Sequence, residues 1–234
     1  MANEVISNAM SLLEKLEQSQ PDNVSKAADS VVQALTHGGI LQAFGCGHSV
    51  AGALELCHRA GGLVPTKLIR EPAYGDYEIV EGVGSLFMIK VEVLKEDVVF
   101  VISHSGRNPL PIEVCLESQK RGAKVVAVTS VEASKATTSR HSSGKLLYQL
   151  ADVVIDTGVP SGDAIIKLEG LDTKICGMSS IVTTAALQWT VLEIAKKMLA
   201  AGLEPPFYKS QNLDGGHEYN DRMMDRYLSR IWHI

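Results

Sequence analysis

Short apolar runs alternate with helical patterns along most of this chain of 234 residues, and this alternation restricts the fold more than any other feature. Two helical segments come first, at about 3–18 and 22–37. We then expect strands at 40–44, 63–69, 98–102, 125–129 and 153–155. Strands that alternate with helices form a parallel sheet covered on both faces. The sequence therefore predicts an α/β fold of three layers, with two N-terminal helices before the sheet.

The predicted helices after the first strand lie at about 49–60, 76–88, 109–121, 131–137, 145–150 and 174–201, with an amphipathic segment at about 216–230. Asp22 is the expected N-cap of the second helix, which Gly38 and Gly39 close. A long polar loop at 156–171 is a candidate wall for an active site. No linker or repeat divides the chain, so we expect one domain over 1–234. Within it, 1–37 is an N-terminal helical segment and 203–234 a C-terminal extension.

Charge and cysteine usage restrict the partners and the compartment. The formal charge is −5, which does not favour a surface that collects nucleic-acid phosphates. The four cysteines form no C-x-x-C pair or metal-ligand pattern, and the first twenty residues lack the apolar run of a signal peptide. We therefore expect a cytoplasmic protein that starts at Met1, with no nucleic-acid partner.

One segment, 175–192, has no charged residue and reaches the length at which a membrane span is considered. Its polar residues fall along one side of a helix, which predicts a buried helix with a polar stripe instead of a membrane partner. The stripe consists of Ser179, Ser180, Thr183, Thr184 and Gln188. Packing between helices is the simpler explanation of its small residues, and contact with a ligand or a second subunit is the alternative.

Two of the strand ends carry unusual loops, and ligands of doubly wound sheets bind beyond these ends. The first predicted strand is followed by Gly45, Cys46, Gly47, His48 and Ser49. Glycines allow a tight turn that leaves N–H groups free beside a hydroxyl at a helix start, as anion sites require. An ordinary strand-to-helix turn capped by Ser49 is the alternative, because the spacing of known nucleotide loops is missing.

The second loop follows 98–102 and contains Ser103, His104, Ser105, Gly106, Arg107 and Asn108 before Pro109, which suits the first turn of a helix. A helix needs only one capping side chain, whereas this loop offers several. In a doubly wound sheet both loops lie at one edge, so their hydroxyls and N–H groups can bind one small anion. We expect His48 and His104 to donate to that ligand, with simple packing as the alternative.

The paired motifs FGCGHS and VISHSGRNP resemble the sugar isomerase (SIS) domain family, whose second motif is typically S-x-S-G-x-[ST]. The stretches ELCHRAGGL and PIEVCLESQKRGAKVVAVTS resemble phosphosugar-binding members of the same family. Asn108 stands where the family has a final hydroxyl residue. The resemblance, over about 30–200, implies a flavodoxin-like sheet of five parallel strands and a homodimer or homotetramer. It also implies a sugar-phosphate ligand held by Ser49, Ser103, Ser105 and Asn108.

The family includes isomerases, etherases and sensory domains, so the motifs indicate a ligand class and leave the reaction open. We expect an aldose-ketose sugar-phosphate isomerase that acts through a cis-enediol, because no helix-turn-helix pattern accompanies the domain. The alternatives are a phosphosugar-sensing protein without turnover and an amino-sugar-acid phosphate lyase or etherase. Isomerisation by this route needs a base and an acid, and no metal or other cofactor.

The candidate base is Glu55, within ELCHRAGGL, and Glu81 is the second candidate. A solvated ion pair between Glu55 and Arg59 explains the presence of Glu55 equally well. His217 is the candidate for ring opening, because histidine titrates near neutral pH, and it could serve a neighbouring subunit. A residue at a helix start is its alternative. The other four histidines carry no such signal: His37, His58, His141 and His233.

Overall fold

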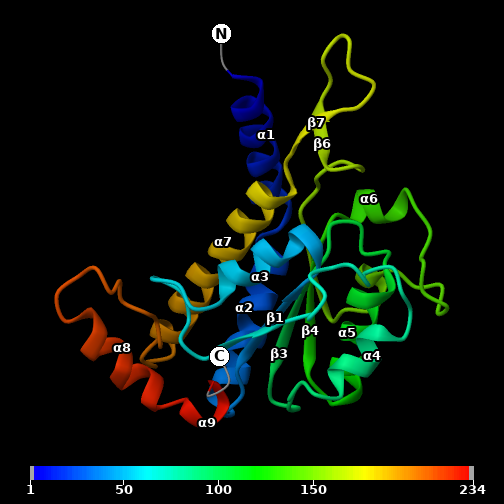
Figure 1. Cartoon of the computed structure of the whole chain (residues 1–234). Helices are drawn as coiled ribbons and strands as arrows, with labels where there is room; N and C mark the ends of the chain where they lie inside the picture. The colour runs from blue at the N-terminus through cyan, green and yellow to red at the C-terminus, as the bar shows by residue number, and fades with distance from the viewer. Residues whose placement is uncertain (1–2, 232–234) are drawn as a thin grey trace.

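The computed structural model describes residues 3–231, and its centre is a five-stranded parallel sheet (Figure 1). The strand order is β2-β1-β3-β4-β5, which confirms the predicted α/β class and the flavodoxin-like topology. The strands are β1 (Leu41–Gly45), β2 (Thr66–Ile69), β3 (Val98–Ile102), β4 (Lys124–Thr129) and β5 (Val153–Asp156). The chain crosses from one side of β1 to the other between β2 and β3. The strand order therefore reverses between β1 and β3, where their loops diverge.

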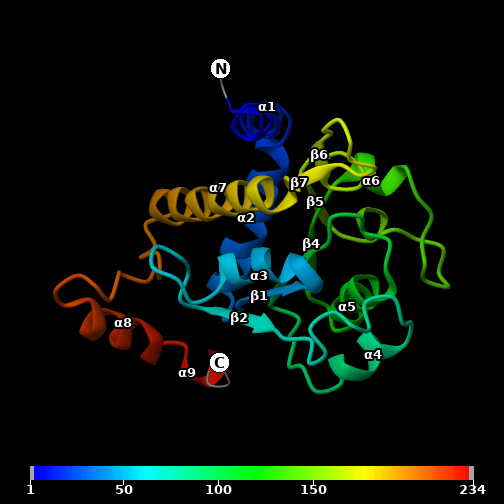
Figure 2. The ribbon, with the colours of Figure 1, turned by 45° about the horizontal axis from the view of Figure 1, so that its top comes forward.

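Alternate residues of each central strand pack into different cores. In β3, Val98, Phe100 and Ile102 belong to the core shared with α2 (Pro21–Thr36), α3 (Val50–Leu56) and α7 (Ser179–Ala200). Val99 and Val101 belong to the opposite core, which packs against α4 (Val83–Met88) and α5 (Pro109–Lys120). Side chains of a strand point to opposite faces in turn, so a strand that is apolar throughout requires a layer on each side. Figure 2 shows the two helical layers.

The remaining elements lie around these three layers. Helix α1 (Glu4–Ser19) packs on α7, and α6 (Val131–Lys135) follows β4. Short 3₁₀ turns occupy Gly47–Ser49 and Leu147–Gln149. Strands β6 (Ala164–Ile166) and β7 (Ile175–Gly177) pair as an antiparallel hairpin before α7. The C-terminal segment contains α8 (Gly216–Asp225) and α9 (Leu228–Ile231), on the side of the molecule opposite to α4 and α5 (Figures 1 and 2).

Several predicted boundaries are wrong because glycine interrupts the pattern or tertiary pairing replaces it. The expected helix at 76–88 is helical only from Val83, since Gly75 and Gly82 adopt positive φ angles of 100° and 93°. The expected helix at 174–201 begins as β7 because this stretch pairs with β6. Asp22 lies within the first turn of α2 and is not its N-cap. Gln20 is the N-cap, and Pro21 occupies the first helical position, where its missing N–H costs nothing.

From Ser179 on, the charge-free segment is, as predicted, part of a packed helix with a polar stripe: α7 lies against α1, α2 and α3. Buried residues such as Val182, Ala186 and Leu187 belong to the main core. Within residues 3–231, no helix is long and apolar enough to cross a membrane.

A buried carboxylate joins the C-terminal helix to the edge of the sheet where β1 and β3 begin. Asp97, whose side chain is fully buried, accepts from the N–H of Ile40 at 2.9 Å and from Gln42 Nε2 at 2.8 Å. Nη2 of Arg230, from α9, donates to its two oxygens at 3.0 and 2.8 Å. The N–H of Leu94 donates to it as well, at 2.9 Å. This cluster therefore fastens the C-terminal segment to the core.

Candidate functional site

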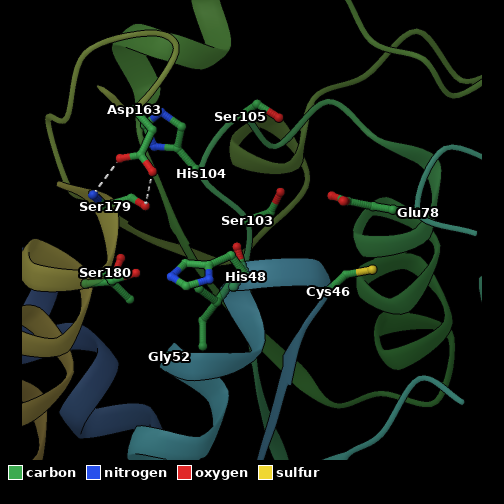
Figure 3. A pocket seen from close by; sticks show the side chains of 13 residues that line it. Cys46, His48, Gly52, Glu78, Ser103, His104, Ser105, Asp163, Ser179 and Ser180 are labelled. Carbon is green, nitrogen blue, oxygen red and sulfur yellow. Dashed lines mark hydrogen bonds between the residues drawn. The ribbon is translucent and has the colours of Figure 1, made fainter. Parts of the chain in front are cut away.

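A pocket of about 190 Å³ lies beyond the carboxyl ends of β1 and β3, at the point where the strand order reverses. This is where doubly wound folds bind ligands. Its walls come from the two strand-end loops, Glu78 of the 71–82 segment, Asp163 just before β6, and the start of α7 (Figure 3). The lining residues are Cys46, His48, Ser49, Gly52, Glu78, Ile102, Ser103, His104, Ser105, Asp163, Ser179, Ser180 and Thr183.

The first loop requires its glycines. A Cβ atom on Gly45 would lie 2.2 Å from the carbonyl oxygen of Ser49, so only glycine permits the chain to fold back so closely. Gly47 has a φ of 56° and opens the 3₁₀ turn that leads into α3. The N–H groups at the start of such a turn have no partner within it. The loop thus brings Ser49 to the pocket, and among residues 3–231 the N–H groups of Gly47 and His48 have no acceptor.

The second loop is held in place by hydrogen bonds that its carbonyl groups, at residues 104–107, accept from other parts of the chain. The His104 carbonyl accepts from Thr129 Oγ1 at 3.1 Å, and the Ser105 carbonyl accepts from Ser134 Oγ at 2.7 Å. The carbonyls of the next two residues accept from the backbone N–H groups of residues 147 and 140, at 2.9 and 2.8 Å. Because these carbonyls are bonded elsewhere, the loop can turn its N–H groups to the pocket. Within residues 3–231, no partner accepts from the N–H groups of His104, Ser105 and Arg107. Successive free N–H groups of this kind form an anion-binding concavity.

The two hydroxyls of the second loop differ in how exposed they are and in whether they already form a hydrogen bond. Ser103 is buried, and its Oγ accepts from the N–H of Gly106 at 3.3 Å, so part of its role is to shape the loop. Ser105 is partly exposed and lines the pocket. Figure 3 shows both hydroxyls beside the same open space. Ser105 is therefore the hydroxyl that a ligand could engage with least disturbance of the fold.

Asp163 organises the third wall of the pocket. It has a φ of 64°, and its carboxylate accepts from the N–H groups of Met178 and Ser179 at 2.9 and 2.7 Å and from Ser179 Oγ at 2.9 Å (Figure 3). Asp163 thereby caps α7, and the first turn of α7 brings Ser180 and Thr183 to the pocket. The polar loop and part of the polar stripe that the sequence singled out do contribute to this wall.

Glu78 is the lining carboxylate with capacity to spare. Its Oε1 accepts from Asn108 Nδ2 at 2.8 Å, while Oε2 lies so close to Gly47 that a Cβ atom there would be 3.6 Å away. None of the 13 lining residues is Lys or Arg, so hydroxyls, N–H groups and imidazoles are the donors available to an anion. A carboxylate beside such donors can exchange a proton with a bound molecule.

The imidazole of His104 has an unusual environment. Its Nε2 lies 3.2 Å from the carbonyl oxygen of Pro160, which can only accept, so this contact places a proton on Nε2. Its Nδ1 is buried and has no partner among the described residues. Buried polar atoms without a partner are uncommon in folded proteins. His104 therefore has unused hydrogen-bonding capacity at the pocket wall.

The thiol of Cys46 is not equipped to act as a nucleophile. Burial, and to a lesser extent the nearby carboxylates of Glu78 and Glu71, raises the pKa of Cys46 to about 12. The reactive form of cysteine is the thiolate, and a raised pKa removes it at neutral pH. Cys46 therefore serves as an apolar wall of the pocket.

We expect iodoacetamide at pH 8 to leave Cys46 unmodified in the folded protein. Raising the pKa from 9.0 to about 12 lowers the thiolate fraction at this pH by on the order of a thousandfold. Peptide mass spectrometry after a short exposure measures the modification, and the partly exposed Cys176 is the internal control. Modification of Cys46 at the rate of Cys176 would contradict this interpretation.

Residues 5–130 match the SIS domain family. Over 97% of its length the chain is also 47% identical to the UPF0309 protein of Listeria monocytogenes, of which it covers 97%. The chain belongs to the SIS domain family. The UPF0309 protein of Streptomyces avermitilis is 34% identical over the whole chain and 97% of that relative.

Solved structures share the fold of this SIS domain at low sequence identity. The phosphoheptose isomerase GmhA from Neisseria gonorrhoeae aligns with a TM-score of 0.53 at 16% identity, over 82% of this chain and 93% of that one. The Vibrio vulnificus NanR protein, solved as a complex with ManNAc-6P, aligns with a TM-score of 0.52 at 14% identity, over 96% of this chain and 66% of that one. These likenesses support the fold alone.

The SIS domain brings most of the predicted phosphate-binding residues to one place. His48, Ser49, Ser103, His104 and Ser105 line the pocket. Three glycines shape the two loops through their backbone: Gly45, Gly47 and Gly106. Asn108 is outside the lining and bonds to Glu78 and to Arg140 Nη1, at 2.8 and 3.0 Å. In this structure Asn108 positions a carboxylate.

The three predicted catalytic residues lie outside the lining of this pocket. Glu55 faces the other end of α3, where it accepts from Gln188 Nε2 at 2.7 Å and pairs with Arg59. Glu81 is exposed, and hydrogen bonds from the Ser142 side chain and backbone lower its pKa. His217 is exposed in the first turn of α8, on the side of the molecule away from α5 (Figures 1 and 2). Their catalytic roles stay predictions. His233 lies outside the described residues.

The sequence did not indicate the two carboxylates of the pocket, Glu78 and Asp163. Glu78 lies in a segment with a helical pattern, and nothing in that pattern indicates that turns carry it to the end of β1. Asp163 was part of the polar loop but had no signal of its own, because its role depends on a left-handed backbone and on a helix start fifteen residues later in the chain. The only sequence signal that the 76–88 helix is incomplete is the glycine-rich stretch at 75–84.

Proposed function

We propose that this protein binds a sugar phosphate in the pocket between the two strand-end loops. The observation that carries the proposal is the second loop, whose four carbonyls are bonded elsewhere while its free N–H groups lie beside Ser103 and Ser105. Together with Ser49 these groups offer neutral donors for a phosphate without requiring a lysine or arginine. The structural relatives include proteins described as a phosphoheptose isomerase and as a complex with ManNAc-6P, which agrees with this ligand class.

The reaction proposed for this site is aldose-ketose isomerisation through a cis-enediol. A base removes the proton from one of the two carbons C1 and C2 and returns it to the other, while a proton moves between their oxygens, so no bond to a cofactor is needed. Glu78 is the lining carboxylate best placed for the carbon-bound proton, since Asp163 is committed to three donors of α7. His48, the exposed imidazole of the lining, is the candidate to exchange a proton with a sugar oxygen.

We keep catalytic roles for Glu55, Glu81 and His217 in the proposal only for a site that two subunits share. Each lies outside the pocket of its own chain, so it could serve catalysis only at a site shared with a second subunit. The expected homodimer or homotetramer and the cytoplasmic setting likewise remain predictions. Binding without turnover, as in a sensor, is the alternative that the experiments below separate.

Ser105→Ala should weaken sugar-phosphate binding by about tenfold to a hundredfold, because a hydrogen bond to a charged group contributes roughly 1.5–3 kcal/mol. The side chain is partly exposed, so the fold should be retained. Isothermal titration calorimetry measures the change in Kd. Ser103→Ala should weaken binding as well, with an added loss of stability because Ser103 Oγ holds the loop through Gly106.

Ser161→Ala is the matched control, since Ser161 is exposed and lies outside the pocket lining. Its affinity for the sugar phosphate should equal that of the wild-type protein. Unchanged affinity in both Ser105→Ala and Ser103→Ala would remove the second loop from the site and with it the phosphate role proposed here.

A further inference from the structure

A second polar pocket lies between the C-terminal end of α3 and the C-terminal extension. It shares no lining residue with the pocket at the strand ends. Its walls are the 58–60 turn that follows α3 and the 208–212 loop, with part of α8 behind them. The lining residues are His58, Arg59, Ala60, Tyr208, Lys209, Ser210, Gln211, Asn212, Asn220 and Met224.

The charges of this second pocket differ from those of the first. Its lining includes two cations, Arg59 and Lys209, and no carboxylate, whereas the first pocket has two carboxylates and no lysine or arginine. Arg59 is paired with Glu55, which neutralises part of its charge. Lys209 Nζ donates to the backbone carbonyl of Asp214 at 2.9 Å and has no carboxylate within ion-pair distance among residues 3–231. Lys209 thus retains its charge for a ligand.

The backbone around Lys209 is fixed in place. The buried side chain of Asn220 accepts from the N–H of Lys209 at 2.8 Å and donates to its carbonyl at 2.9 Å. The preceding residue, Tyr208, exchanges two hydrogen bonds with Gly61 and Gly62, both at 2.9 Å. The backbone from which the Lys209 side chain extends into the pocket lining is therefore hydrogen-bonded at Lys209 and at the residue before it.

The opposite wall is also rigid. His58 adopts a φ of 52°, which is uncommon for a residue with a side chain, and its Nδ1 lies 3.4 Å from the hydroxyl of Tyr208. Burial, followed by the charge of Arg70, lowers the pKa of His58, so the ring is neutral at pH 7 and can donate or accept a hydrogen bond. Side-chain amides of Gln211 and Asn212 add neutral donors.

We propose that this pocket binds a small oxyanion, a phosphate or carboxylate group of a metabolite, with Lys209 as its principal charge partner and Arg59 as the second. The two cations, the neutral donors and the absence of a lining carboxylate match the recognition of an oxyanion. The site is separate from the sugar-phosphate pocket and connected to it by α3, which has one pocket at each end. Its ligand is therefore a second molecule or an effector.

The test follows the imidazole resonances of His58 by NMR during titration with inorganic phosphate and, separately, with acetate. His58→Asn assigns these resonances, because asparagine tolerates a positive φ. We expect a saturable shift with at least one of the two anions, and the tighter of them identifies the phosphate or the carboxylate class. Lys209→Met should weaken the affinity at His58 at least tenfold, whereas Lys196→Met, a distant exposed lysine paired with Glu193, should leave it unchanged.

Ser105→Ala separates this proposal from the function proposed above. It should weaken binding in the first pocket and leave the anion affinity measured at His58 as it was. The proposal is overturned if neither anion gives a saturable shift, or if Lys209→Met and Lys196→Met reduce the affinity equally. It is likewise overturned if Ser105→Ala abolishes the shift, because His58 would then report on the first pocket.

Discussion

Glu78→Gln should lower turnover of the sugar-phosphate substrate by roughly 10²–10⁴, the range typical of losing a general base, while ligand affinity is kept. Glutamine retains the size of the side chain and an oxygen that can accept from Asn108 Nδ2, so the pocket should keep its shape. The glutamine amide is not basic, however, and cannot take the proton from C1 or C2 of the sugar. Steady-state kinetics measures kcat, and calorimetry with the same sugar phosphate measures affinity.

Glu169→Gln is the control for this experiment, because Glu169 is exposed on the β6–β7 hairpin loop and lies outside the pocket. Its kcat should match the wild-type value. Wild-type turnover in Glu78→Gln would transfer the role of base to Glu55, which Glu55→Gln then tests. A wild-type protein that binds sugar phosphates without converting any of them would support the sensing alternative.

Asp97→Ala should destabilise the fold by about 3–5 kcal/mol, the cost of removing one partner from a buried charge pair. The substitution leaves Arg230 Nη2 and the N–H groups of Ile40 and Leu94 without their Asp97 acceptor. Gln42 Nε2 loses one of its two acceptors and keeps the Glu92 carbonyl. Urea unfolding followed by circular dichroism measures the free energy of unfolding.

Glu204→Gln is the matched control, since it breaks the pair with Arg226, which also involves the C-terminal segment but is solvent exposed. Exposed pairs contribute about 0–1 kcal/mol, so this variant should unfold almost as the wild-type protein does. Equal stability of Asp97→Ala and Glu204→Gln would show that the Asp97 cluster does not hold the C-terminal segment to the core.

The fold was predictable from sequence because the central strands are apolar on both faces. Val98 to Ile102 is a continuous apolar run, and only a strand covered by a layer on each side buries all of it. The 76–88 segment was not predictable by the same reasoning. Its apolar spacing suits a helix, but Gly75 packs against Gly47 so closely that a Cβ atom would lie 2.8 Å from that residue's nitrogen. A contact of this kind between distant segments leaves no periodic signal.

The meeting of Ser49, Ser103 and Ser105 in one pocket was predictable for a related reason. Ser49, Ser103 and Ser105 directly follow strands, and parallel topology alone brings strand ends to one edge. The acid-base side depends on long-range placement. Glu55 follows the first loop closely in sequence, yet the intervening α3 carries it to the other end of the helix, beside Arg59 and Gln188. Glu78 comes to the pocket through a chain of turns whose path no local pattern indicates.

The central claim, that this SIS domain binds sugar phosphates through the two strand-end loops, is tested most directly by a paired thermal-shift measurement. Hexose, heptose and amino-sugar phosphates are each compared with the matching unphosphorylated sugar, in the wild-type protein and in Ser105→Ala. Because a ligand that binds only the folded state raises Tm, at least one phosphate should do so, its free sugar should not, and Ser105→Ala should reduce the rise. The claim is contradicted if no phosphate raises Tm, if free sugars raise it equally, or if the rise is the same in Ser105→Ala.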